Sequence, residues 1–489
     1  MKPKYEIMKN ISVMTIINLI IRSASISFNA YLTSRIGATG IGLFQLVMSV
    51  YSLAVTFSCA GIKLAVTRIA VEIFTSQKYN MKKSVSYCIT YAGLCGTVIA
   101  FILFWFSEII AKQWIGDIQT VFPLKVLSLS LPFVSMSSAL CGYFTAVNKI
   151  PQYSLIQTAE QVFKISVILL IFKFNQNLNA MNSCLYIVIG MTLSEIFSFI
   201  ISKIYFSKTI QKDDNKRIFN SSGFFRIALP DAFGTCIRNI LVTTEHLLIP
   251  KNLKKSGINS TKSLSVYGII HGLVIPVLLY PSAILSSLSA VIIPELAEKY
   301  ELKDHTGINK TVRKCLKYTF IYSIVCMLIM TVFSSVTAEI FCKNKEAAKY
   351  IRILAPLIPL MYTDMVTDGM LKGLDQQLYS MKYNIIDSVF CVLSVIFILP
   401  KYAVKGYIFT LYFSEIMNFY LSLNRLITIC NIRFFQEHEE DNSTFFQLKK
   451  CSVFRKVCEY HTYRDRRIRS QAPLSYRRTI RIQDLRELR

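Results

Sequence analysis

The chain has 489 residues, of which 53% are hydrophobic and only 17% charged, and its mean hydropathy is +0.43. This composition is too apolar for a water-soluble protein of this length and indicates that the lipid bilayer is its main solvent. The formal net charge of +26 does not indicate a nucleic-acid partner. Basic loops of a membrane protein are explained by the positive-inside bias and by attraction to anionic membrane lipids.

Twelve apolar stretches have about the 20 residues that a helix needs to cross a hydrocarbon core of about 30 Å. In chain order they are residues 11–32, 41–60, 84–106, 122–147, 153–172, 184–206, 227–249, 265–293, 318–341, 351–371, 383–399 and 407–429. The sequence therefore predicts an all-α polytopic membrane protein with twelve transmembrane helices.

The second six stretches repeat features of the first six. The sixth contains Ser194-Glu195-Ile196 and the twelfth Ser414-Glu415-Ile416, while Gly42 in the second stretch corresponds to Gly268 in the eighth. Duplicated halves are how many secondary transporters build a central site between two lobes. We expect two pseudosymmetric six-helix lobes at residues 1–206 and 226–429, a cytoplasmic linker at 207–225 and a basic cytoplasmic tail at 430–489.

The distribution of Lys and Arg predicts the orientation in the plasma membrane. With the N-terminus in the cytoplasm, most basic loops fall on the cytoplasmic side, as the positive-inside bias requires. Both termini are then cytoplasmic. The groups around Lys251 and around Lys343 are exceptions that this orientation leaves outside.

Charged residues within the apolar stretches are the candidate functional residues, since an Arg at the middle of a membrane helix costs roughly 2.5 to 3.5 kcal/mol and normally faces a polar interior. Arg22 lies on one helical face with polar neighbours, and Arg238 occupies a similar place in the second half. Alternatively, Arg238 pairs with Asp231 or Glu245 and locks the bundle. The candidate substrate-binding residues are Arg22, Asn18, Asn29, Arg68, Asp231 and Arg238.

Intramembrane acids are candidates for coupling transport to Na⁺ or protons, with packing or pairing as the alternative role. We single out Glu245, Asp364 and Asp368, and note Glu160, Glu195, Asp387 and Glu415. No cofactor, metal site or catalytic motif is expected, because most of the 13 cysteines are scattered singly and no nucleophile elbow or phosphate loop is present. We therefore do not expect an enzyme.

Three segments resemble the stage V sporulation protein B group of polysaccharide-type flippases. They are Ser34 to Gln45 with Gly61-Ile62, Tyr267-Gly268 through Glu298, and Gly373-Leu374 through Asp387. The resemblance covers the chain to about Cys430 and implies the V-shaped, two-lobe fold of the multidrug, oligosaccharidyl-lipid and polysaccharide (MOP) exporter superfamily. It also implies transport of an undecaprenyl-linked saccharide, a peptidoglycan or polysaccharide precursor, for spore cortex synthesis.

Two other functions remain open at this point. One is a cation-coupled multidrug or metabolite antiporter of the same fold, although a cavity for lipophilic cations would be expected to carry carboxylates where this chain has Arg22 and Arg238. The other is a non-transporting scaffold that recruits cell-wall synthesis proteins. Membrane lipids and the lipid-linked saccharide are the expected partners, with cell-wall synthesis proteins as possible further ones.

Overall fold

The computed structural model describes residues 2–76, 80–147, 149–174, 180–209 and 222–430. The expected linker falls largely on residues 210–221, and the expected tail almost wholly on residues 431–489, so both lie outside the described residues. Residues 14–432 form one compact unit. Of the other unit, the described part is the helical segment 2–13.

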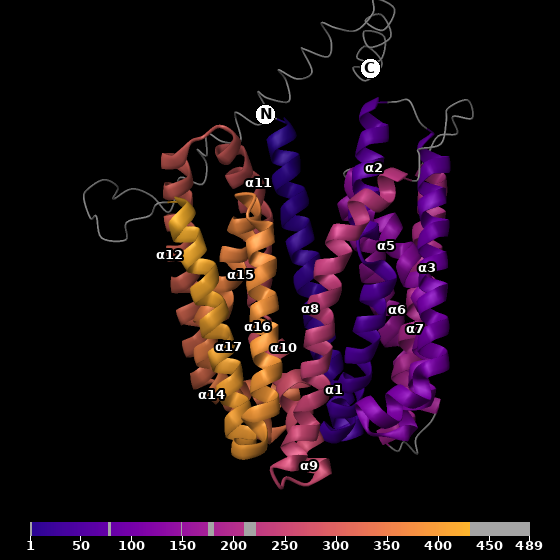
Figure 1. Ribbon diagram of the computed structural model, residues 1–489, viewed down its shortest axis with the longest axis vertical. Coiled ribbons are helices and arrows are strands. Elements are labelled where there is room, and N and C mark those ends of the chain that lie inside the picture. Colours follow the sequence, from indigo (N-terminus) through magenta and orange to yellow (C-terminus); the bar gives the residue numbers. More distant parts are fainter. Residues whose placement is uncertain (1, 77–79, 148, 175–179, 210–221, 431–489) are drawn as a thin grey trace, which may run out of the picture. The chain divides into compact units, whose positions relative to one another are not determined.

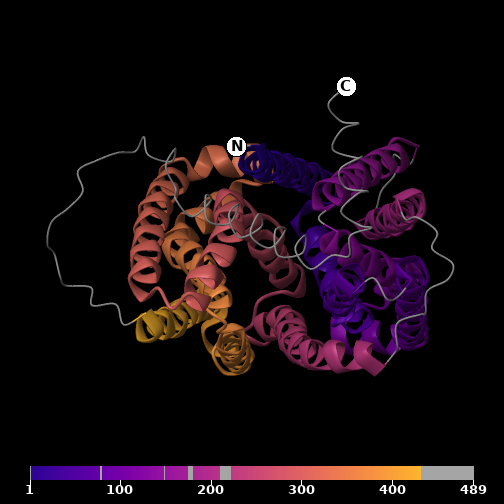
Figure 2. The ribbon, with the colours of Figure 1, turned by 90° about the horizontal axis from the view of Figure 1, so that it is seen from above.

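Every regular element among the described residues is a helix, which confirms the all-α fold, and the two lobes appear as two groups of helices in Figures 1 and 2. The first lobe contains α1 (Lys2–Cys59), α2 (Ile62–Ser76), α3 (Met81–Ile109), η1 (Ile110–Ile115), η2 (Ile118–Thr120), α4 (Val121–Ser128), α5 (Leu131–Ala146), α6 (Ile150–Phe174) and α7 (Ala180–Thr209).

The second lobe starts with α8 (Ser222–Lys255) and ends with α17 (Leu399–Cys430). Between them lie α9 (Ser260–Tyr267), η3 (Gly268–Val274), α10 (Ile275–Leu278), α11 (Ser282–Glu301), α12 (His305–Val332), α13 (Ser334–Thr337), η4 (Ala338–Cys342), α14 (Lys345–Leu354), η5 (Ala355–Leu357), α15 (Ile358–Gly373) and α16 (Gln377–Phe397). Of these, η1, η3 and η4 are π-helical and η5, like η2, is a 3₁₀ turn.

Each lobe is held together by side-by-side helix packing. In the first lobe α2 and α3 pack on α5, and α6 packs on α7; in the second α11 and α12 pack on α15, and α16 packs on both α8 and α17. Large apolar side chains such as Trp105, Phe174 and Phe397 are exposed. An exposed apolar surface of this extent is what a lipid-facing bundle requires.

All twelve expected stretches lie on described helices, but length and hydropathy alone single out seven membrane-spanning segments, or eight when the bent pair α4–α5 is one span. The first of these, Leu19–Phe74, includes two expected stretches, because α1 is two helices merged across a kink at Gly37. Gly37 has φ +70°, a left-handed conformation that glycine adopts without the steric penalty of a side chain. Helices α8, α15 and α17 are not among these segments, and each carries charged residues that matter below.

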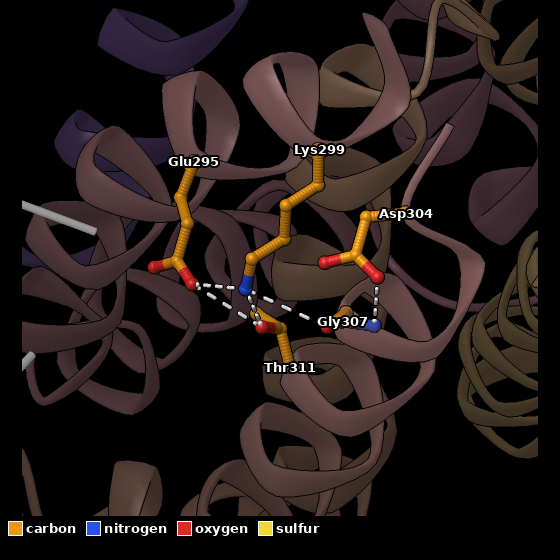
Figure 3. A network of polar contacts seen from close by, with 5 residues as sticks. All are labelled: Glu295, Lys299, Asp304, Gly307 and Thr311. Carbon is orange, nitrogen blue, oxygen red and sulfur yellow. Dashed lines mark hydrogen bonds and ion pairs between the residues drawn. The ribbon is translucent and has the colours of Figure 1, made fainter. Parts of the chain in front are cut away.

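A polar network joins the end of α11 to the start of α12 (Figure 3). The Lys299 ammonium lies 2.6 Å from the Glu295 carboxylate and also donates to Thr311, whose hydroxyl donates to Glu295 over 3.2 Å. Asp304 caps α12 by accepting the backbone N–H of Gly307 at 2.9 Å. The network fixes this turn with groups that satisfy one another.

Candidate functional site

The two lobes meet where α1 crosses η3. A Cβ atom on Gly268 would lie 2.8 Å from the Cα of Gly42 and closer still to the carbonyl of Ala38, and a Cβ on Gly272 would collide with Ile41. Gly268 and Gly272 are four residues apart, as are Ala38 and Gly42, so small residues face each other on both sides. This spacing lets two membrane helices approach backbone to backbone.

Arg22 links α1 to the second lobe. Its guanidinium donates to the carbonyl of Leu279 at 3.2 Å and to the hydroxyl of Ser282 at 3.3 Å, at the break between α10 and α11. Beside it, the hydroxyls of Ser23 and Tyr280 are 2.7 Å apart. A guanidinium has five N–H donors, and its two bonds to described residues leave further donors that a ligand could use.

A cavity of about 230 Å³ lies in the first lobe between both arms of α1, α6 and α7. Two polar residues of the first α1 arm, Ser25 and Asn29, line it. Opposite them are Gln45, Gln161 and Lys164. Neither Arg22 nor Arg238 is among the residues that line this cavity.

Two acidic residues lie near Lys164, the lysine that lines the cavity. Glu160 on α6 and Glu195 on α7 are both within electrostatic reach of Lys164. Among the described residues, neither carboxylate lies within ion-pair distance of the Lys164 ammonium. The ammonium therefore forms no direct ion pair with Glu160 or Glu195. The first lobe therefore buries a lysine and two carboxylates that share a polar interior.

The second lobe collects more acids around Arg238. Asp364 accepts a hydrogen bond from Asn418 at 3.0 Å, and Asp387 accepts one from Ser414 at 2.6 Å. Arg238 acts electrostatically on both carboxylates. Two further acids belong to this group, Glu415, which interacts with Asp364 and Asp387, and Glu245, which interacts with Asp387.

The remaining sequence-predicted site residues are dispersed. Asp368 pairs with Lys372 at 3.3 Å and accepts a short hydrogen bond from Ser380, and Arg68 is exposed on α2. Arg238 is exposed as well. The side chains of Asn18 and Asp231 lie outside the part of the structure that is described, so the expected pairing of Arg238 with Asp231 stays a prediction.

Within the described residues no three His, Cys, Asp or Glu side chains converge closely enough to hold a metal ion. The acids of the second lobe are neighbours in charge without forming one coordination shell.

Two further groups of residues could not be predicted from the sequence. Gln45 and Gln161 are neutral amides inside apolar stretches, and only the pairing of α1 with α6 shows that they face one cavity. A second group surrounds a 2.7 Å hydrogen bond between His246 and Tyr267, with His271 and Tyr407 stacked beside it. Tyr267 and His271 are only four residues apart, but His246 and Tyr407 come from other parts of the sequence, and no spacing rule joins them to this pair.

Comparison with known proteins supports the fold. Residues 7–300 match the family model for polysaccharide biosynthesis protein, and residues 252–398 match the MatE model. Stage V sporulation protein B of Bacillus subtilis (strain 168) is 22% identical over 349 residues, which are 70% of this chain and 67% of that protein. Sporulation protein YkvU of the same organism is 21% identical over 341 residues, 67% of this chain and 74% of that protein.

Solved structures of the same architecture are similar along almost their whole length. The lipid II flippase MurJ in an inward closed conformation has a TM-score of 0.63 at 14% identity, covering 92% of this chain and 99% of that one. An inward-facing multidrug resistance MATE family transporter of the MOP superfamily has a TM-score of 0.63 at 11% identity, covering 85% and 99%. At these identities the likeness establishes the fold, and the expected exporter fold is confirmed.

Proposed function

Because the chain belongs to the polysaccharide biosynthesis protein family, we propose that it moves an undecaprenyl-linked saccharide across the plasma membrane. It is a multi-pass membrane transporter or flippase of the MOP superfamily. The cargo is a peptidoglycan or polysaccharide precursor for spore cortex synthesis, and the names of two relatives support a role in sporulation. Both termini face the cytoplasm.

The single observation that carries this function is the cavity of the first lobe, whose largely apolar wall carries several polar side chains. Amide side chains and a lysine line it, on helices whose outer faces are apolar. Polar residues within a membrane bundle are retained where they contact a substrate or water. Hydroxyl-rich saccharides need such donors and acceptors when they leave water, whereas a lipophilic drug does not.

We assign the diphosphate of the cargo to arginine. Arg22 retains free N–H donors beside the second lobe, and Arg238 is exposed within the first half of α8. Arg binds phosphate oxygens with a planar fork of donors, which favours it over Lys at such a site. Asn18, Asn29, Arg68 and Asp231 complete the proposed substrate contacts.

A second component, cation coupling, is favoured by the acids of the second lobe. Four acids of this lobe lie near one another: Glu245, Asp364, Asp387 and Glu415. The charge of Arg238 acts on two of them, Asp364 and Asp387. Uptake of one proton by this group would relieve repulsion among its charges. Asp368 is a weaker candidate, because Lys372 and Ser380 already neutralise or bond its carboxylate.

The rival functions predict different behaviour. A multidrug or metabolite antiporter of this fold would move lipophilic substrates and leave lipid-linked saccharides in place. A scaffold for cell-wall synthesis proteins would move neither, and it would have no use for a polar cavity between packed helices.

The test is translocation by the purified full chain in sealed vesicles that contain a fluorescent lipid-linked saccharide. Quenching from outside measures the fraction of label that has crossed, and vesicles without protein provide the background rate. We expect a protein-dependent rate that the Gln161→Met variant reduces and the Gln119→Met variant does not, since Gln119 is exposed outside the cavity. Movement of a lipophilic cation without movement of the saccharide would establish the antiporter instead.

A further inference from the structure

We propose that the first-lobe cavity is a subsite for one uncharged sugar ring of the cargo. This inference rests on the proposed flippase function, and it adds where the head group binds and which chemical class of sugar it contains. Four features carry it: unpartnered amides, an apolar wall, a small volume and a local charge that is not positive.

The amides supply the hydrogen bonds. The side chains of Asn29, Gln45 and Gln161 line the cavity, and none of them hydrogen-bonds to another described residue. Each amide has a carbonyl acceptor and two N–H donors. Sugar hydroxyls both donate and accept, so they match amides better than they match groups of one kind. Asn29, Gln45 and Gln161 are half-buried, so a ring of hydroxyls would offer their amides partners in place of water.

The remainder of the wall is apolar. Phe28 and Phe44 come from the two arms of α1, and Ile168 comes from α6. The C–H faces of a pyranose ring pack against such side chains, while its hydroxyl edge reaches the amides. At about 230 Å³ the cavity is smaller than the roughly 300 to 1,000 Å³ of sites for drug-sized ligands, a size that suits one sugar ring of the cargo.

Charge decides between a neutral and an acidic ring. Lys164 alone would attract a carboxylate, but Glu160 and Glu195 are both within its electrostatic reach. Two carboxylates against one ammonium make the region neutral to negative, which disfavours a second anion. Lys164 then donates to a hydroxyl, and the acids keep its ammonium in place.

The position of the cavity links the binding of a sugar ring to the contact between the two lobes. Asn29 and Gln45 lie on opposite sides of the Gly37 kink, so a bound ring would bridge both arms of α1. The Cγ of Gln45 would lie 3.4 Å from a Cβ on Gly272 in the second lobe. The sugar subsite therefore borders the same helix crossing that closes the lobes against each other.

Saturation-transfer NMR on the purified full chain in detergent tests the inference, because it detects weak binding of single sugars without requiring transport. The probes are the methyl glycosides of glucose, N-acetylglucosamine and glucuronic acid. We expect binding of at least one uncharged ring and at least fivefold weaker binding of the glucuronide. Removing one amide, as in Gln161→Met or Asn29→Leu, should weaken the uncharged ring about fivefold, the effect of one lost neutral hydrogen bond.

Gln119→Met is the matched control and should bind like the wild-type chain, and a thermal unfolding curve for each variant separates lost binding from lost folding. Three results would overturn the subsite: no signal from either uncharged ring, stronger binding of the glucuronide, or equal binding by Gln161→Met and wild type. If translocation persists in any of these cases, the flippase function stands without this subsite. Sugar binding by a chain that moves no lipid-linked saccharide would overturn the function and the role given to the subsite.

Discussion

Gly42 and Gly268 hold corresponding places in the two halves of the sequence, and they contact each other across the lobes. Corresponding residues of two symmetric repeats meet at the axis that relates the repeats, so such an axis would pass through the crossing of α1 and η3. The two lobes can separate at this point only if the glycine contact opens. We propose that the crossing acts as a gate between the lobes.

Substituting Gly268 by Val should weaken this gate. The added side chain would meet backbone atoms of Ala38 and Gly42 that cannot move aside independently, and such overpacking costs roughly 1 to 3 kcal/mol. Amide hydrogen exchange at residues 36–46 and 264–274 should rise, and translocation should fall. Gly93→Ala is the control, because its Cβ would meet only the flexible side chain of Met136. Unchanged exchange in the Gly268 variant would show that the contact does not close the lobes.

Arg22 has a structural and a proposed binding role, and Ser282 separates them. Ser282→Ala removes one acceptor of Arg22 but retains its charge and its bond to Leu279, so stability should fall by about 1 kcal/mol with translocation largely kept. Arg22→Ala should lower translocation about tenfold or more, and Arg22→Lys should restore only part of it. If Ser282→Ala and Arg22→Ala lose transport equally at equal expression, Arg22 only links the two lobes and does not bind the cargo.

Asp387 is the acid we expect to carry cation coupling, since it lies among other carboxylates and near Arg238. Asp387→Asn keeps the acceptor for Ser414 but cannot exchange a proton or carry charge. Translocation driven by an imposed pH or Na⁺ gradient should drop at least tenfold, while gradient-free exchange continues. Asp375→Asn, at an exposed turn with φ +58° that Asn tolerates, should behave like wild type. If the Asp387→Asn variant still responds to the gradient, Asp387 is not the residue that couples transport to the cation.

Two buried tyrosines give a matched pair for stability. Tyr267 shares a 2.7 Å hydrogen bond with His246, while the hydroxyl of Tyr407 is buried without a partner among the described residues. Tyr267→Phe should lower the free energy of unfolding by about 1 kcal/mol, and Tyr407→Phe should leave it unchanged or raise it. Thermal unfolding of both variants side by side provides the measurement. The reverse order would contradict the hydrogen-bond assignment.

The network at the α11–α12 turn should matter more than an exposed ion pair of similar geometry. The side chains of Lys299 and Glu295 are 14% and 23% exposed, against 52% and 62% for Lys112 and Glu108 at the same 2.6 Å separation. Glu295→Gln leaves a shielded ammonium without its counter-charge and should cost roughly 1 to 3 kcal/mol. Glu108→Gln should leave the unfolding temperature unchanged, because water already screens that pair.

The sequence by itself determined the membrane environment, the helical class and the duplication, because each depends on the kind and order of residues along the chain. Apolar stretches of the required length have one stable form in lipid, and the paired Glu195 and Glu415 show the repeat directly. Ser25 and Asn29 also followed from spacing alone, since residues four apart share a helix face.

Tertiary structure decided which polar residues act together. Gln45, Gln161 and Lys164 meet Asn29 only because α1 bends at Gly37 and packs on α6 and α7, and no local pattern specifies that packing. Likewise, Arg22 reaches Leu279, which is 257 residues away in sequence, through the meeting of the two lobes. Periodicity gives the face a side chain occupies, whereas the partner across that face is set by the packing of helices distant in sequence.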